Sequence, residues 1–377
     1  MSRPEAGPEA WTVILDEPDA GLHVEWRRAP PRRLHGPPLF RTDCNTPVLS
    51  EDGRVLAFPA GFRPIGHSLR RTGSVPLRFD PPSDPVRILA DPHPEAGLWI
   101  ESVWRAPDGL LYGWYHRERR GPCAEPLNVY SVGTIRSTDD GRTWSHVGLL
   151  VEPRPEEIDC TFDNGWFAGG YGDFCVMPDR SGRYFLLHLT SYHADPDRQG
   201  IVVARYPVAD RDRPDVALEW WTASGWRRRE AGTPLPLIRP VRGWRHRDPD
   251  AHWGPAVHWN ADIACWVMLL NHTRDGAWNL VQRSIDVAFN RDAGDPSGWT
   301  APRPLVAGGI WYPQAICPDG SEREGKGALR FFVSGFSLWE IRFRPGPAAT
   351  PARRVEISED EIAEGFGPRQ PDGGFGC

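Results

Sequence analysis

The sequence predicts an all-β protein, and three observations lead to that class. Forty prolines and 39 glycines separate runs of aromatic and β-branched residues, a pattern typical of many short strands joined by turns. Helical periodicity is nearly absent from the 377 residues. One unit also recurs along the chain: an apolar strand, a turn rich in Asp and Gly, and a more aromatic strand.

The repeated unit occurs five times. In the first copy, a strand at residues 46–49 leads through a turn at 51–53 to a strand at 55–58. The later copies span residues 100–116, 172–188, 254–270 and 312–333. A spacing of roughly 60 to 80 residues suits propeller blades with long loops. We therefore predict a five-bladed β-propeller over residues 41–345, with a six-bladed, sialidase-like propeller as the alternative if residues 205–240 form their own blade.

Outer strands follow most of these units. Third strands are predicted at residues 132–136, 201–205, 279–283 and 338–342, and a further outer strand near Trp226. After the first of these third strands, residues 137–144 read Ser-Thr-Asp-Asp-Gly-Arg-Thr-Trp. Asp139 can accept hydrogen bonds from turn amides, Gly141 tolerates positive φ, and Trp144 begins the next strand. Ser284, Asp286 and Trp299 form a weaker copy of this turn.

The two ends of the chain are predicted to differ. A strand at residues 11–15 completes the last blade and removes a free sheet edge, while the Pro-rich residues 29–38 form a connector. Residues 1–40 are therefore an N-terminal strand and connector. Residues 346–377 form a C-terminal tail that becomes loose after about Ile362. A short helix at 358–363 begins at Ser358, with Glu361 as its capping-box partner.

Composition excludes several classes of function. The net charge of −6 is spread along the chain without a basic stripe, so nucleic acid is not an expected partner. No 18-residue apolar run predicts a membrane span, and the first residues contain no apolar signal segment, so we expect a cytoplasmic location. The seven cysteines include no C-x-x-C pair, which favours reduced thiols over a zinc site. Nothing in the sequence indicates an oligomeric state.

Carboxylates stand where the first strands of three units begin. In a propeller these strands line the central channel, so Asp43, Glu101 and Asp173 are expected to converge. Glu101 lies among apolar residues, where a carboxylate is unfavourable unless it is paired or faces a wet channel. Grouped carboxylates are the machinery of glycosidic cleavage. We predict Glu101 as the general acid and Asp43 or Asp173 as the base or nucleophile.

Polar and aromatic residues at the same strand ends are predicted to bind the substrate. They are His116, Arg117, Glu118, Asp250, His252, Trp253, Tyr312 and Gln314. Trp253, Trp311 and Tyr312 could stack on sugar faces. No histidine spacing indicates a metal site, so no cofactor is expected, although a structural calcium in the channel stays open.

Two family resemblances follow from these motifs. Residues 137–144 match the Asp-box of sialidases, and residues 45–58 resemble a first sialidase blade. Sialidases, however, carry an arginine where this chain has Asn45. The five-unit spacing, with Trp253-Gly254-Pro255 and Tyr312-Pro313-Gln314, looks more like arabinanases and β-xylosidases.

This second resemblance implies an Asp base at Asp43 and an Asp modulator at Asp173. Trp253 stands where those enzymes have their acid. The acid would then come from elsewhere, with Glu101 first and Asp250 or Glu118 next.

The favoured function is a carbohydrate-active hydrolase that cleaves a glycosidic bond of a small carbohydrate at the propeller axis. Three alternatives remain. One is a sialidase-like exo-glycosidase. Another is a lyase or phosphorylase, for which Arg105 or Arg117 could hold phosphate. The last is a non-catalytic propeller that binds a glycan or a protein.

Overall fold

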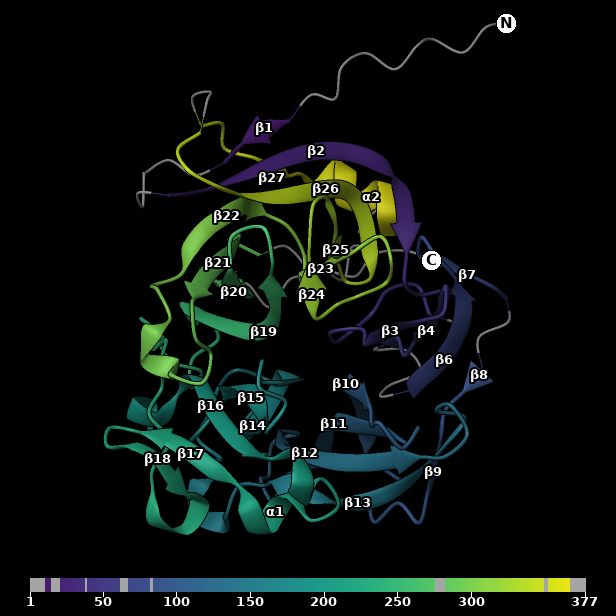
Figure 1. Ribbon diagram of the computed structural model, residues 1–377. Helices are drawn as coiled ribbons and strands as arrows, with labels where there is room; N and C mark the ends of the chain where they lie inside the picture. The colour runs from purple at the N-terminus through teal and green to yellow at the C-terminus, as the bar shows by residue number, and fades with distance from the viewer. Residues whose placement is uncertain are drawn as a thin grey trace, which may run out of the picture.

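Four hydrogen-bonded sheets of five, ten, six and six strands surround a common centre in the computed structural model (Figure 1), and the ten-stranded sheet joins two blades through one parallel strand pair. The structure describes residues 11–14, 21–37, 39–61, 67–81, 84–274, 282–348 and 352–366. The innermost strands are β3 (Val48–Glu51), β10 (Gly97–Arg105), β14 (Phe167–Pro178), β19 (Ala251–Asn260) and β23 (Gln314–Ile316). Each is the innermost main strand of one blade, so the predicted five-bladed β-propeller is confirmed.

The first three blades run outward in chain order. Blade 1 contains β3, β4 (Arg54–Ala57) and β6 (His67–Ser74), with the short strands β5 (Ala60–Gly61), β7 (Arg78–Phe79) and β8 (Asp84–Pro85) paired to β6. Blade 2 contains β10, β11 (Leu111–Arg120), β12 (Asn128–Ser137), β13 (Thr143–Val151) and β9 (Arg87–Leu89). Blade 3 contains β14, β15 (Tyr184–Ser191), β16 (Gly200–Pro207), β17 (Glu219–Thr222) and β18 (Gly225–Arg228).

Blades 4 and 5 recruit segments from elsewhere in the chain. Blade 4 contains β19, β20 (Cys265–Thr273), β21 (Ser284–Asn290) and β22 (Arg303–Gly308), edged by β24 (Glu324–Gly325) and β27 (Glu356–Ile357). Blade 5 contains β23, β25 (Leu329–Val333), β26 (Phe336–Pro345), β2 (Leu22–Arg33) and β1 (Thr12–Val13). The α-helices are α1 (Pro214–Ala217) and α2 (Glu359–Phe366), and 3-10 turns lie at Pro155–Glu157, Pro196–Arg198, Val208–Asp210, Arg229–Ala231 and Pro296–Gly298. Among the described residues, neither helix is long and apolar enough to cross a membrane.

The N-terminal segment completes the fifth blade, as predicted, but over a longer stretch. β2 pairs with β26, and β1 pairs with β2. The predicted connector is wrong for residues 29–33, which belong to β2. Pro30 and Pro31 are tolerated because the pairing with β26 is interrupted between Arg28 and Arg32, where no ladder amide is needed. The last blade also contacts the first: Gln314 Oε1 accepts from Thr46 N at 2.8 Å, and Gln314 Nε2 donates to Thr46 O at 3.0 Å.

Blade 3 excludes the six-bladed alternative. The strands within residues 205–240 are β17 and β18, which extend blade 3 outward from β16. β18 is the outer strand expected near Trp226. The third strand of blade 4 begins later than predicted, at Ser284, and residues 279–281 of the predicted strand lie outside the described residues.

The turn at residues 137–144 connects β12 to β13 as its sequence predicts. Asp139 Oδ1 accepts from Thr143 N at 2.9 Å and Asp139 Oδ2 from Thr143 Oγ1 at 2.7 Å. Gly141 adopts φ +78°, and Trp144 is fully buried. The prediction of a weaker copy of this turn is wrong, because Ser284 and Asp286 lie inside strand β21.

The C-terminal segment is more ordered than expected. Ser358 Oγ accepts from Glu361 N at 3.3 Å, and Glu361 Oε2 accepts from Ser358 N at 3.1 Å, so the predicted capping box is formed. Ile362 and Phe366 are buried, and the ring of Phe366 packs on Phe336 of β26 at 5.5 Å. A loose tail directly after Ile362 is therefore wrong, and residues 367–377 lie outside the described residues.

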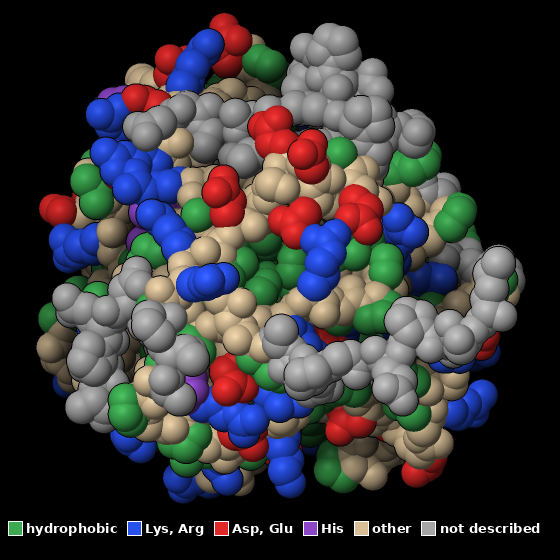
Figure 2. All heavy atoms as spheres, turned by 90° about the horizontal axis from the view of Figure 1, so that it is seen from above, with side chains coloured by type: hydrophobic (Ala, Val, Ile, Leu, Met, Phe, Trp, Pro, Cys, Tyr) green, Lys and Arg blue, Asp and Glu red, His purple; other side chains and the backbone are tan. Residues whose placement is uncertain are grey.

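The side of the molecule that lies uppermost in Figure 1 carries mixed charge. Figure 2 shows acidic and basic side chains interspersed across this side, with hydrophobic ones between them. Several of them pair, as Arg28 does with Glu361 and Glu364 of α2. The pattern agrees with the absence of a basic stripe in the sequence.

The cysteines correct one expectation. Cys123, in the loop between β11 and β12, forms a disulfide with Cys160, just before β14. Reduced thiols were expected for both. Spacing could not reveal this pair because the two loops meet only in the folded chain. Cys44, Cys175, Cys265 and Cys317 are free, and Cys377 lies outside the described residues.

Candidate active site

Interruptions in two inner strands place carboxylates at the axis. The pairing of β10 with β11 skips between Ile100 and Ser102, and that of β14 with β15 skips between Gly172 and Phe174. The extra residues are Glu101 and Asp173. A bulge re-aims its side chain and bends the strand, so apolar neighbours still pack between blades. Asp173 adopts φ +42°, a left-handed conformation that Asp tolerates better than most residues.

A cavity of about 160 Å³ lies at the axis beside Asp173. Three carboxyl groups from three blades line it: Asp43, Glu118 and Asp173. Asn128 adds an amide, and the remaining walls are aromatic. The aromatic lining residues are Trp99, Tyr130, Trp166, Phe167, Tyr192, Trp253, Trp311 and Tyr312. An engineered apolar cavity of about 150 Å³ holds one benzene molecule, so this space is large enough for a single six-membered ring.

Asp173 is held by two tyrosines. Tyr312 Oη donates to Asp173 Oδ1 at 2.9 Å, and Tyr192 Oη donates to Oδ2. Burial and the charge of Asp173 raise the pKa of both phenols well above the ordinary value, so both remain protonated donors. Both carboxylate oxygens are thus occupied, and the side chain has a fixed orientation at the cavity wall.

Glu118 projects from β11 into the same cavity. Its Oε2 accepts from Asn128 Nδ2 at 3.0 Å, and its Oε1 lies 3.9 Å from His116 Nε2. Tyr130 stands directly opposite Glu118 on β12. Burial raises the pKa of Glu118, and the charge of His116 opposes that rise.

Asp43 precedes β3, the first strand of blade 1, and its backbone amide donates to Ala60 O at 2.9 Å. Burial and then the charge of Glu118 raise the pKa of Asp43 well above its usual range. The charge of Glu118 thus favours the neutral form of Asp43, so one cavity can offer both a neutral and a charged carboxyl group.

Glu101 lies behind the cavity and not in its lining. Its side chain has no exposed surface, Oε2 accepts from Phe174 N at 3.0 Å, and Oε1 lies 3.2 Å from His116 Nδ1. Burial raises the pKa of Glu101, against the effect of His116. Burial would lower the pKa of His116, but the bond to Glu101 and the nearby carboxylates raise it. The donor atoms of Glu101, His116 and Asp173 lie within 4.8 Å of one another.

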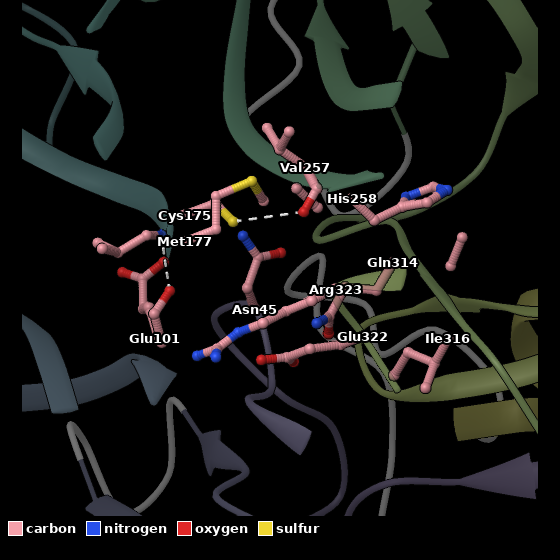
Figure 3. Close-up of a pocket in the computed structure, with 14 residues that line it drawn as sticks. Asn45, Glu101, Cys175, Met177, Val257, His258, Gln314, Ile316, Glu322 and Arg323 are labelled. Atoms are coloured by element: carbon pink, nitrogen blue, oxygen red, sulfur yellow. Dashed lines mark hydrogen bonds between the residues drawn. The ribbon is translucent and has the colours of Figure 1, made fainter. Parts of the chain in front are cut away.

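A second, smaller cavity is lined by Glu101 together with residues of the neighbouring blades (Figure 3). Its volume is about 30 Å³, enough for water but not for a sugar. Asn45 crosses it: Nδ2 donates to Phe174 O at 3.2 Å and to Pro255 O at 2.9 Å. The residue at the arginine position of sialidases therefore joins three blades. Gln314 also lines this cavity and bonds Thr46, so it does not belong to the lining of the larger cavity.

Four other predicted binding residues lie outside the larger cavity. Arg117 points to the opposite face of β11 because successive side chains alternate; it is buried and pairs with Asp91 at 2.7 Å. Asp250 and His252 join a separate group on blade 4. His116 lies behind Glu118, whereas Trp253 and Tyr312 line the cavity as predicted.

Sequence reasoning missed several lining residues. Tyr130 and Asn128 start the third strand of blade 2, and Tyr192 directly follows the second strand of blade 3. One signal was available: Glu118 and His116 are two positions apart in a strand, so both face the axis. The tyrosines carried no such signal, because each acts on a carboxylate of a neighbouring strand, and that contact depends on the pairing of the strands.

The axial group Glu101, His116 and Asp173 suits a cation poorly. The neighbouring carboxylates favour protonated His116, and a protonated imidazole cannot act as a ligand. Both oxygens of Asp173 already accept from tyrosines. Calcium needs six to eight oxygen ligands, so this geometry lends the open calcium alternative no support.

Comparisons with known proteins give structural similarity only. No family model and no curated protein matches the sequence. An α-L-arabinanase from Penicillium chrysogenum, in complex with arabinobiose, is similar with a TM-score of 0.49, 13% identity and 88% of each chain covered. An arabinanase from Bacillus subtilis has a TM-score of 0.48 and 13% identity, with 81% of this chain and 99% of that chain covered.

An exo-β-1,3-galactanase from Phanerochaete chrysosporium has a TM-score of 0.46 and 9% identity. The match covers 83% of this chain but spans only 62% of the galactanase chain. Two of these three structures are arabinanases, and the third is a galactanase. At such low scores and identities they assign neither a substrate nor the role of any residue.

Proposed function

We propose that the protein is a glycoside hydrolase that cleaves a glycosidic bond of a small carbohydrate in the axial cavity. The observation that carries the proposal is the convergence of Asp43, Glu118 and Asp173 on one aromatic-walled cavity. Glycosidic cleavage requires one carboxylic acid and one carboxylate on either side of the bond. Aromatic rings supply apolar faces against which a sugar ring can pack.

The environments of the carboxyl groups suggest their roles. Burial raises the pKa of Glu118, but the charge of His116 and the hydrogen bond from Asn128 favour its charged form, so we assign Glu118 as the base. Burial and the charge of Glu118 favour neutral Asp43, so we assign Asp43 as the proton donor to the leaving oxygen. Asp173, fixed by two tyrosines, would stabilise the positive charge that develops on the sugar ring.

The sequence predicted Glu101 as the general acid, and this assignment gives that role to Asp43 instead. A general acid must reach the leaving oxygen within about 3 Å, and the Glu101 side chain has no exposed surface. Its hydrogen bond to Phe174 N instead fixes the bulge that presents Asp173. We therefore treat Glu101 as a positioning residue.

The other enzymatic alternatives find less support. A sialidase or a phosphorylase needs cationic side chains around an anionic group. Among the described residues that line the cavity, none is Arg or Lys. Arg117, considered earlier as a phosphate ligand, pairs with Asp91 on the far face of β11.

A panel of aryl glycosides with different sugars tests the proposal. We expect Glu118→Gln and Asp43→Asn each to lower kcat by about 10²- to 10⁴-fold, the usual contribution of general acid–base catalysis. Glu51→Gln is the matched control, because Glu51 is an exposed carboxylate of the same blade as Asp43. Substrates with good leaving groups need no proton from a general acid. They should therefore restore the kcat of Asp43→Asn more than that of Glu118→Gln. Full activity in both variants would refute the two-carboxylate mechanism.

A further inference from the structure

A group of two histidines and an aspartate on blade 4 has no part in the proposed function. His252 comes from β19, His272 from β20 and Asp286 from β21. His252 pairs with His272 across β19 and β20, and His272 pairs with Ser284 across β20 and β21. Asp286 lies two residues after Ser284 and so points to the same face. Three adjacent strands therefore bring these side chains together, although they are distant in the sequence.

The donor atoms of this group are close enough to share one ion. His252 Nε2 lies 2.9 Å from Asp286 Oδ2, and His272 Nδ1 lies 3.4 Å from the same oxygen. One donor atom from each of the three residues lies within 4.8 Å of the others. Zinc bonds of 2.0–2.2 Å in a tetrahedral site place neighbouring ligand atoms about 3.3 Å apart. Small side-chain adjustments would centre an ion among the three.

Outer contacts orient two of the ligands in the way metal sites require. His272 Nε2 lies 2.8 Å from Asp250 Oδ1, which favours the tautomer with its proton on Nε2. Nδ1, which lies 3.3 Å from Ser284 Oγ, then has a lone pair that a metal can use. Ser284 Oγ donates to Asp286 Oδ1 at 2.6 Å, so the other oxygen, Oδ2, faces the histidines. Ligating imidazoles and carboxylates are usually held by such partners.

The site is also accessible. The side chains of His252 and His272 are 15% and 16% exposed, whereas that of Asp286 is 3% exposed. The two imidazole rings stack with their centroids 4.2 Å apart. Two imidazoles that face one carboxylate oxygen supply ligand types that suit a divalent transition metal, and an ion bound here would displace the proton that Asp286 and Asp250 favour on His272.

We propose that His252, His272 and Asp286 bind a divalent transition-metal ion, with zinc as the best match, and that Asp250 orients His272. Two imidazoles and one carboxylate supply three ligands and leave a fourth position for water. A bound ion would tie together β19, β20 and β21. β19 also carries Trp253, which lines the axial cavity. The site stands apart from the carboxyl groups of the proposed hydrolase.

Metal titration of the full chain tests this site. After treatment with a chelator, Zn²⁺ is titrated by calorimetry and Co²⁺ by visible absorption. We expect one ion per chain, strong Co²⁺ bands of a four-coordinate site, and a zinc-dependent rise in melting temperature. Asp286→Ala and His272→Ala should each lose at least 100-fold in affinity, and Asp250→Asn about 10- to 100-fold.

His246→Ala is the control, because His246 is an exposed histidine outside the group, and it should bind zinc as the wild type does. Circular dichroism checks that each variant is folded. If a variant does not fold, the wild-type Co²⁺ spectrum and stoichiometry decide alone. The proposal is overturned by wild-type protein that binds no zinc at a defined stoichiometry, or by folded Asp286→Ala and His272→Ala variants with unchanged affinity.

Discussion

The two tyrosine contacts to Asp173 allow a quantitative test of the axial site. In Tyr312→Phe the ring stays and the hydroxyl that donates to Asp173 Oδ1 at 2.9 Å is lost. Both side chains are buried. Hydrogen bonds to charged groups contribute about 1.5–3 kcal/mol, and packing is unchanged, so we expect the free energy of unfolding to fall by about 2 kcal/mol. Urea denaturation at neutral pH measures it.

The same variant also tests the proposed function. If Asp173 stabilises charge in the transition state, a misplaced carboxylate should lower kcat/KM by about 10- to 100-fold, since each tenfold corresponds to about 1.4 kcal/mol. Tyr192→Phe removes the second donor. Because the two tyrosines share one carboxylate, the double variant should depart from the sum of the single effects by at least about 0.5 kcal/mol.

Tyr184→Phe provides the control. Tyr184 is half-buried on β15, and its ring contacts Arg205, so loss of its hydroxyl should change the free energy of unfolding by less than about 0.5 kcal/mol. The reasoning is refuted if Tyr312→Phe is as stable and as active as Tyr184→Phe. If the effects of Tyr312→Phe and Tyr192→Phe are additive in the double variant, the conclusion that the two tyrosines act through one carboxylate is refuted.

Three further predictions concern the scaffold. Trp144→Ala removes a fully buried side chain and should lower the free energy of unfolding by about 3–5 kcal/mol, measured by urea denaturation. Cys123→Ser opens a disulfide that spans 37 residues and should lower it by about 2–4 kcal/mol, with no further effect of reductant on the variant. Burial raises the pKa of Glu322 from 4.5 to about 7. Its stabilising contribution is therefore present below its ordinary pKa and lost as pH rises through about 7, and Glu322→Gln should flatten that part of the stability–pH curve.

Local signals made the blades predictable. The five inner strands and their Asp–Gly turns were found because alternating apolar residues and turn residues are encoded within a few positions. The strand at residues 29–33 was missed for a specific reason. Its two prolines read as a connector, and only the interrupted pairing with β26 makes room for them. The Cys123–Cys160 disulfide was missed because the proximity of two loops is a tertiary fact.

The site was harder to predict because depth along the axis is not encoded in the local pattern. Glu101 and Asp173 both lie at interruptions of inner strands, and both were expected at the axis. The sequence could not show that Glu101 would be sealed behind the cavity while Glu118, from the neighbouring strand, lines it. The alternation of side chains along a strand could have shown that Glu118 and Arg117 point to opposite faces. The spacing of residues in the sequence could not predict the group of His252, His272 and Asp286 on blade 4, because these side chains meet only through the register of three strands.

The contacts of Glu101 suggest why a buried, unreactive carboxylate is kept so close to the axis. Its Oε2 accepts from Phe174 N, the amide that directly follows Asp173 in the bulge. Without that acceptor, a buried backbone donor at the bulge would lose its partner, at about 1–3 kcal/mol, and the strained φ of Asp173 would lose a support. His116 in turn balances the charge of Glu101 and lies 3.9 Å from Glu118. The buried ion pair of Glu101 and His116 thus connects the bulge that carries Asp173 with Glu118, and it couples the positions of these two cavity carboxylates.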